Sequence, residues 1–95
     1  MTGKQRAMLR SMANTMEPIL YIGKDGVTDA TLKETYDALE ARELVKCVVQ
    51  NNSELSAREA CAILCEKTHA EPVQCIGRRC VLYRESRENK RIQLR

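Results

Sequence analysis

A short glycine-framed loop is the segment of this chain best suited to binding an anion. Gly23 and Gly26 enclose Lys24 and Asp25, after an apolar run and shortly before Thr28. Glycine permits a strained turn and lets another backbone approach closely, and Thr28 is a good N-cap. A helix beginning there would bring free N–H groups and its positive dipole end to the loop, an arrangement that binds phosphate. A plain strand-to-helix turn is the alternative, because a single Gly-x-x-Gly is a weak signal.

Basic residues are concentrated toward the two ends of the chain. The 95 residues include 16 Lys and Arg and 13 Asp and Glu, which gives a net charge of +3. Residues 1–33 carry five basic and three acidic residues, residues 34–83 carry six and eight, and residues 84–95 carry five and two. This distribution favours a surface that faces a polyanion over a uniformly solvated one.

Cysteine and histidine side chains are the second candidate for a functional site, because they could bind a metal ion. Cys61, Cys65 and His69 are spaced four residues apart and could project from one helix. Zinc sites usually pair their cysteines more closely and supply four clear ligands, and a cysteine on an apolar stripe packs as a small hydrophobe. We therefore favour core packing and expect no metal and no cofactor. The single histidine also lacks an evident catalytic partner, so we expect neither an enzyme nor a small-molecule substrate.

The composition indicates one domain with an aliphatic core. The chain is long enough for one core and contains no Trp or Phe, so Met, Cys and Tyr must supplement the aliphatic residues. No run reaches membrane-spanning length, and the N-terminus lacks the apolar region of a signal peptide. We therefore expect a cytoplasmic monomer with no membrane partner, whose five cysteines are reduced.

Hydrophobic periodicity and capping signals predict the elements that position these residues. Thr2 and Ser56 each begin a capping box, and the first helix should end before Pro18. The predicted elements, in order, are a helix that ends before Glu17, a strand at 19–22, a helix at 29–42, a strand at 44–50, a helix at 57–68 and two strands at 71–76 and 80–84. This order predicts an α/β fold in a single compact domain, with a four-stranded mixed sheet packed with helices.

The same patterns predict which side chains are buried and how the chain divides. The apolar faces are expected to contain Met8, Leu9, Met12 and Met16 on the first helix, Leu32, Tyr36 and Leu39 on the second, and Ala60, Cys61 and Leu64 on the third. Residues 1–84 form the domain. Residues 85–95 form a basic tail that we expect to be partly ordered at best, either an arm that contacts the polyanion or a solvated end.

The topology predicts that several basic groups meet at one edge of the sheet. Strands joined by crossover helices run parallel, so the C-terminal ends of the first three strands share an edge, where ligands of open α/β sheets bind. The short connection after the first helix predicts that this helix runs antiparallel to the first strand and returns its N-terminus to that edge. The groups expected there are Lys4, Arg6, Lys24, Arg78 and Arg79, with Arg10 one turn further along.

Four segments in order carry a family resemblance. They are Thr-Gly-Lys-Gln at 2–5, Pro-Ile-x-x-Ile-Gly-Lys-x-Gly-Val-Thr at 18–28, Ala-Leu-Glu-Ala-Arg-Glu-Leu-Val-Lys at 38–46 and Ile-Gly-Arg-Arg-x-Val-Leu-Tyr-Arg at 76–84. Together they resemble the YhbY-type RNA-binding proteins, whose domain is called the CRM (chloroplast RNA splicing and ribosome maturation) domain. The resemblance implies a fold similar to the C-terminal domain of translation initiation factor three. It also implies the association of bacterial members with precursors of the large ribosomal subunit, and of plant members with group II intron splicing.

The resemblance also implies which residues contact RNA. The family's glycine loop is matched by Gly23, Lys24 and Gly26, and its nearby basic surface by Lys4, Arg6 and Arg10. The number of cysteines and Asp25 depart from the family pattern. Asp25 either offsets the charge of Lys24 or caps the next helix.

We therefore expect a protein that binds ribosomal RNA of large-subunit (50S) precursors. With three tyrosines as its only aromatic residues, it should contact phosphates and 2′-hydroxyls of structured RNA more than stack on bases. The alternative is a protein-interaction adaptor whose basic edge meets an acidic partner and whose glycine loop is only structural.

Overall fold

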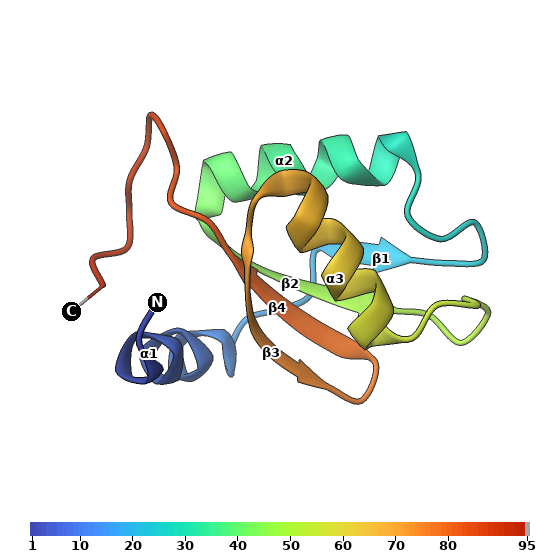
Figure 1. The fold of residues 1–95 in the computed structure, drawn as a ribbon, viewed down its shortest axis with the longest axis horizontal. Coiled ribbons are helices and arrows are strands. Elements are labelled where there is room, and N and C mark those ends of the chain that lie inside the picture. The colour runs from blue at the N-terminus through green and yellow to red at the C-terminus, as the bar shows by residue number, and fades with distance from the viewer. Residues whose placement is uncertain (95) are drawn as a thin grey trace.

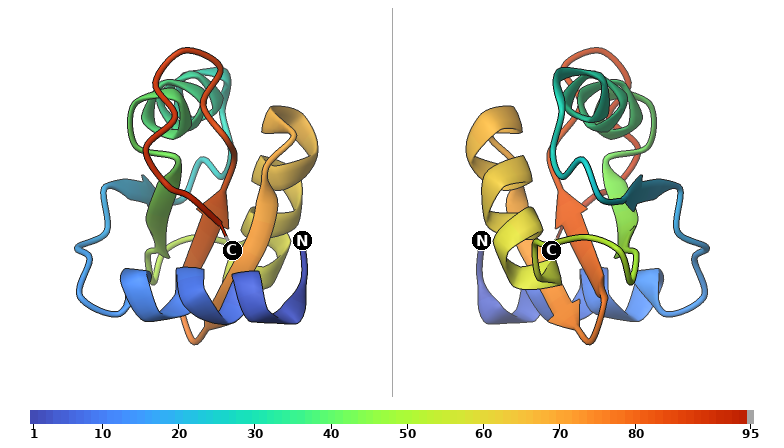
Figure 2. Two further views of the ribbon diagram at one scale, coloured as in Figure 1. Left: turned by 90° about the vertical axis from the view of Figure 1, so that its left-hand side faces the viewer. Right: turned by 90° about the vertical axis from the view of Figure 1, so that its right-hand side faces the viewer.

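The structure, a computed structural model, describes residues 1–94 and arranges its helices and strands in three layers. α1 lies on one face of the sheet, and α2 and α3 cover the other (Figure 1 and Figure 2). The predicted α/β order is confirmed. The elements are α1 (Gly3–Ala13), β1 (Leu20–Ile22), α2 (Asp29–Arg42), β2 (Leu44–Val49), α3 (Ala57–Thr68), β3 (Glu71–Ile76) and β4 (Arg79–Tyr83).

The four strands form a mixed sheet in the order β1-β2-β4-β3. β1 and β2 are parallel, and β4 is antiparallel to both β2 and β3. β1, β2 and β3 therefore point the same way, as predicted, and their C-terminal ends lie along one edge of the sheet. β4 returns the chain to the opposite edge, where the tail begins.

Side-chain caps fix where the helices begin. The Thr2 hydroxyl accepts a hydrogen bond from the Gln5 backbone N–H, at 3.1 Å, and the Gln5 side chain accepts one from the Thr2 N–H. Ser56 and Glu59 form the same reciprocal box at the start of α3. These caps satisfy N–H groups that the first helical turn leaves without partners, which is why the capping boxes located these helix starts from sequence.

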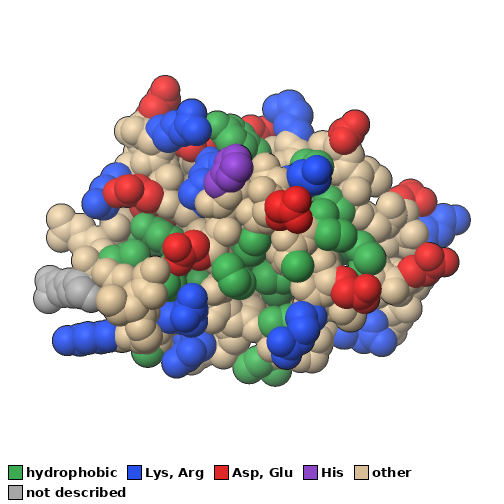
Figure 3. Space-filling view, viewed as in Figure 1, with side chains coloured by type: hydrophobic (Ala, Val, Ile, Leu, Met, Phe, Trp, Pro, Cys, Tyr) green, Lys and Arg blue, Asp and Glu red, His purple; other side chains and the backbone are tan. Residues whose placement is uncertain are grey.

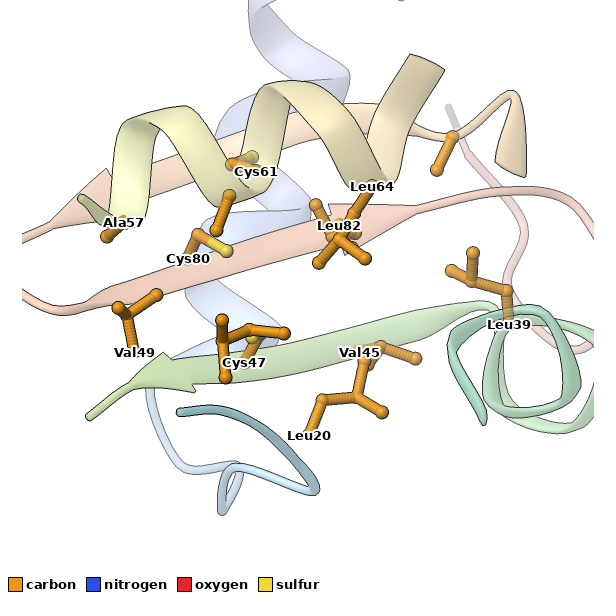
Figure 4. Packing of buried hydrophobic residues seen from close by; sticks show 13 residues of the cluster. Leu20, Leu39, Val45, Cys47, Val49, Ala57, Cys61, Leu64, Cys80 and Leu82 are labelled. Carbon is orange, nitrogen blue, oxygen red and sulfur yellow. The ribbon is translucent and has the colours of Figure 1, made fainter. Parts of the chain in front are cut away.

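The larger core lies between the sheet and the α2–α3 layer. Leu64 and Cys61 of α3 and Leu39 of α2 are buried against Cys47 and Leu82 of the sheet (Figure 4). Cys61 therefore packs in the core, as the sequence pattern favoured. Residues 1–94 contain no group of three or more His, Cys, Asp and Glu arranged to hold a metal ion.

The smaller core lies under α1. Leu9 and Ala13 are fully buried against Val81 and Tyr83. Met12, which was expected on this face, is instead 39% exposed because it lies on the flank of the helix. None of the helices in the described chain is long and apolar enough to cross a membrane.

The expectation that Tyr36 lines the buried face of α2 is wrong. Tyr36 is 40% exposed, and Thr35 is buried in its place. The Thr35 hydroxyl donates to the Thr31 carbonyl oxygen at 2.8 Å, so its polar atom is satisfied within the helix. The Tyr36 ring lies under the Arg84 guanidinium, whose Cζ is 4.4 Å from the ring centroid.

The C-terminal tail is fixed to the domain, contrary to the prediction of partial order for its described part. The Glu43 carboxylate, fully buried, accepts hydrogen bonds from the backbone N–H groups of Ser86, Arg91 and Ile92 at 2.8, 2.6 and 2.7 Å. Ile92 is buried in the smaller core. The tail therefore rises beside α2 and returns to the level of the sheet (Figure 2). Its charged composition gave no sign of this anchor.

Candidate nucleic-acid interface

The glycine loop is a tight turn that presents two charged side chains to solvent. The Gly26 N–H donates to the Gly23 carbonyl oxygen at 3.1 Å, which closes a four-residue turn. Lys24 and Asp25 occupy the exposed tip. Gly26 has a φ of +69°, in the left-handed region that favours glycine. The turn therefore requires glycine at position 26.

The first glycine provides close packing against the loop that follows β2. A Cβ at position 23 would lie 3.0 Å from Oε1 of Gln50. The Gln50 backbone N–H donates to the Ile22 carbonyl oxygen at 2.8 Å, just before the turn. These contacts hold the glycine loop beside the β2–α3 loop.

The β3–β4 turn joins the same edge. The Val49 N–H donates to the Arg78 carbonyl oxygen at 2.7 Å, and Arg78 Nη1 reaches the Gln50 carbonyl oxygen at 3.5 Å. Arg79 begins β4 directly after this turn and is exposed. The structure thus brings Lys24, Arg78 and Arg79 to one edge of the sheet, as the strand directions predicted.

The start of α1 does not lie at this edge, which corrects the prediction for Lys4 and Arg6. The Met1 amine lies 3.6 Å from Glu71 Oε2, and Arg6 Nε lies 3.3 Å from the Pro72 carbonyl oxygen. Both partners are at the beginning of β3. α1 crosses the strands instead of running antiparallel to β1 (Figure 2). The physical reason is that α1, with Leu9 in its buried face, packs on β2, β3 and β4 together, which requires a helix laid across them.

The candidate cations carry no internal ion pair. Among residues 1–94, ion pairs within 4.0 Å join Met1 to Glu71, Lys33 to Asp37, Arg84 to Glu40 and Lys90 to Glu85. None of the basic side chains predicted to bind RNA takes part. In Figure 3, Lys and Arg side chains are spread over the whole face and include several along its lower rim, over α1 and the β3–β4 turn, whereas the acidic side chains lie above that rim.

The structure excludes one of the two alternatives for Asp25, the helix cap. The N-cap of α2 is Thr28, whose hydroxyl accepts from the Thr31 N–H at 3.1 Å. The Asp25 carboxylate makes no hydrogen bond or ion pair with residues 1–94. Asp25 therefore does not cap the helix, and it leaves Lys24 without a carboxylate within 4.0 Å in that range.

The opposite side of this edge, next to α3, is acidic. Glu54, Glu59 and Arg78 line one shallow hollow with Ser53 and Leu55. The Glu59 carboxylate accepts a hydrogen bond from the Ser56 backbone N–H at 2.9 Å, and this bond, with one from the Ser56 hydroxyl, holds the pKa of Glu59 below its usual value of 4.5. Glu59 is thus negatively charged at neutral pH, and the hollow combines two glutamates with the Arg78 guanidinium.

Sequence reasoning missed two exposed side chains at the same edge. Tyr21 is 57% exposed and Ile76 is 66% exposed. Both were treated only as members of apolar strands. The alternation in Leu20-Tyr21-Ile22 was the available signal, because alternate residues of a strand face opposite sides of the sheet.

Comparison with known proteins identifies the family. The family model described as the CRS1 / YhbY (CRM) domain matches residues 1–84. The chain is 45% identical over 94 residues to the probable RNA-binding protein YqeI of Bacillus subtilis, covering 99% of this chain and 98% of that protein. It is 35% identical over 91 residues to an RNA-binding protein of Haemophilus influenzae, covering 96% and 91% of the two chains.

A solved structure shows the same fold. The solution structure of a hypothetical protein from Staphylococcus aureus matches with a TM-score of 0.82 and 45% identity. The match covers 100% of this chain and 99% of that chain. The three-layer arrangement and the strand order therefore have an experimental counterpart across the whole chain.

Proposed function

This chain belongs to the CRS1 / YhbY (CRM) domain family, and we propose that it binds RNA through the glycine-loop edge of its sheet. The family is one of RNA-binding domains and not of enzymes. The observation that carries the assignment to this edge is the set of Lys24, Arg78 and Arg79, which lie along the same edge of the sheet without an ion-pair partner among residues 1–94. Such cations can neutralise phosphates and release counterions.

We further propose that the RNA is ribosomal RNA in precursors of the large subunit. The family resemblance supports this target, and the geometry supports a contact made mainly with the RNA backbone. Lys24 is at the tip of a tight turn and Arg78 is in another turn, so both can reach phosphates of a folded RNA without entering a groove. Arg6 and Arg10 of α1 are candidates for a second, separate contact.

Paired charge reversals test the proposed edge. Lys24→Glu with Arg78→Glu should weaken binding to a structured ribosomal RNA fragment at least about tenfold at 0.1 M salt, because two phosphate contacts become repulsive. Lys33→Glu with Lys67→Glu is the matched control, since it changes the net charge equally on the exposed surfaces of α2 and α3. Fluorescence anisotropy measures both. Equal losses in the two variants would show a general charge effect and remove the assignment to this edge.

Sedimentation of cell lysate tests the target. The protein should move with precursors of the large subunit and leave them after ribonuclease treatment or at raised salt. A complex that survives ribonuclease would instead support the protein adaptor. Movement with other RNA alone would retain RNA binding and overturn the ribosomal target.

A further inference from the structure

Four residues form a single row across the whole sheet at the glycine-loop edge. The strand register pairs Tyr21 with Val48, Val48 with Arg79, and Arg79 with Ile76. Directly paired residues project from the same face of a sheet. Their neighbours Leu20 and Cys80 are buried on the α2–α3 side, so this row faces the α1 side.

α1 leaves this row uncovered. The helix packs against Leu44, Val81 and Tyr83, which lie nearer the opposite edge of the sheet. Figure 1 shows α1 toward the end of the molecule that holds the chain termini, with the strand ends extending away from it. Tyr21 and Ile76 are consequently more than half exposed. An aromatic ring and an aliphatic side chain thus lie open at either end of a row that contains an arginine.

The Tyr21 ring is held in position by its own hydroxyl. The hydroxyl donates to the Pro18 carbonyl oxygen at 3.2 Å, on the connection that leads into β1. This bond satisfies the polar end of the side chain within the protein. The ring is therefore oriented in advance, while its surface remains available to a planar ligand.

The charge around the row is positive. Arg79 is in the row and exposed, and Lys46, which is largely buried, lies in the next row toward α1, paired with Val81 on the same face. Neither has a carboxylate within 4.0 Å in the part of the chain that the structure describes. The hollow lined by Glu54, Glu59 and Arg78 lies on the other side of the edge, next to α3. A polyanion is therefore favoured on the α1 side.

We propose that this row is a platform for an unpaired RNA base, with Tyr21 as the stacking residue. The inference rests on the RNA binding proposed above and adds the form of RNA recognised. Phosphates would contact Lys24 and Arg79, while a base from an adjacent nucleotide lies on the Tyr21 ring. Base–aromatic stacking is tolerant of sequence, so the site selects unpaired over paired RNA and does not select one base. A purely phosphate-binding edge would not make this distinction.

A tryptophan reporter tests the contact directly, because the chain contains no Trp. Tyr21→Trp should show quenched fluorescence when titrated with a single-stranded oligoribonucleotide, since stacking brings a base against the indole. Heparin, a polyanion without bases, should bind the edge without comparable quenching. Tyr36→Trp is the control, because position 36 is on α2 beneath Arg84. Its fluorescence should change little with either ligand.

Affinity measurements supply a second, independent readout. Tyr21→Leu should weaken binding to the single strand roughly tenfold and leave binding to a fully paired RNA duplex unchanged. Tyr21→Phe keeps the ring and should retain most of the affinity. Circular dichroism establishes that each variant is folded.

The outcomes separate the two proposals. RNA binding by anisotropy without quenching of the Tyr21→Trp reporter would overturn the stacking platform and leave the proposed function in place. Equal loss of single-strand and duplex affinity in Tyr21→Leu would do the same. Absence of binding to any RNA by the unaltered protein would overturn the proposed function itself.

Discussion

Charged residues at the two edges of the sheet differ in how far they are bound to partners within the protein. At the tail edge, Glu43 accepts three backbone hydrogen bonds and Glu40 lies 2.7 Å from Arg84. At the glycine-loop edge, Lys24 and Arg79 have no such partner among residues 1–94. Charges at the tail edge therefore hold the chain together, and charges at the loop edge are available to a ligand.

The two edges also differ in which residue types have a positive φ. The loop edge places glycine at its left-handed positions, Gly26 at +69° and Gly77 at +58°. The tail edge places Glu43 at +66° and His69 at +62°, where a side chain is unfavourable. Glu43 is kept there by its carboxylate bonds to the tail and by backbone bonds, including one from the Arg84 N–H at 3.0 Å. Strain is thus tolerated where surrounding contacts determine the conformation.

Removal of the Glu43 charge should produce the largest effect on stability. Glu43→Gln replaces one acceptor oxygen with an NH₂ group that faces backbone N–H donors. We expect a loss of about 3 kcal/mol in the free energy of unfolding, as for a broken buried charged network. Urea denaturation measures this loss. A variant as stable as the original protein would contradict the conclusion that charges at the tail edge hold the chain together.

Acid should destabilise the protein through the same carboxylate at the tail edge. Burial raises the pKa of Glu43, but hydrogen bonds from the N–H groups of Ser86, Arg91 and Ile92 lower this pKa by more than burial raises it. The pKa of Glu43 in the folded protein therefore lies below the usual 4.5. A lowered folded pKa gives stability that is complete above the unfolded value and is lost as pH falls through the folded value. The free energy of unfolding should therefore decline below about pH 4.5.

The Glu43→Gln variant is the control for this pH effect. Its stability should decline less steeply over the same acid range, because that carboxylate no longer titrates. Denaturant melts at several pH values give the two slopes. Parallel curves would assign the acid sensitivity to other groups, of which Glu40 and Glu59 also have a lowered pKa.

A glycine substitution separates backbone strain from packing at the loop edge. Gly77→Ala should cost about 1 kcal/mol of stability, because an L side chain is disfavoured at positive φ, whereas its Cβ would meet no atom within 4 Å. Gly3→Ala is the matched control, since its Cβ also has open space and its φ is not positive. Thermal melting compares the two. Similar melting temperatures would show that the turn at Gly77 relaxes without cost.

Neutralising one cation at the loop edge should have the smallest effect and should leave stability unchanged. Arg78→Ala is expected to weaken RNA binding about threefold at 0.1 M salt and to lower the slope of log affinity against log salt by roughly 0.7 to 0.9, the loss of one phosphate contact. Anisotropy titrations at four salt concentrations determine the slope. An unchanged slope would mean that Arg78 makes no phosphate contact and would weaken its place in the proposed site.

The sequence by itself determined the elements and the edge at which most of the proposed RNA site lies. Capping pairs such as Thr2 with Gln5 and the period of the apolar residues act over a few residues, so they can be read locally. The rule that strands joined by a crossover helix run parallel then fixed the directions of β1, β2 and β3. That rule was sufficient to predict that Lys24, Arg78 and Arg79 lie along one edge of the sheet.

Only the tertiary structure decided how α1 crosses the sheet, where the tail packs and which strand residues stay exposed. Each of these depends on contacts between residues far apart in the chain. Leu9 packs across several strands, and Glu43 binds N–H groups more than forty residues later. Tyr21 is exposed because the helix crosses elsewhere on the sheet. Local patterns carry no information about such distant partners, and packing decides among the arrangements that they allow.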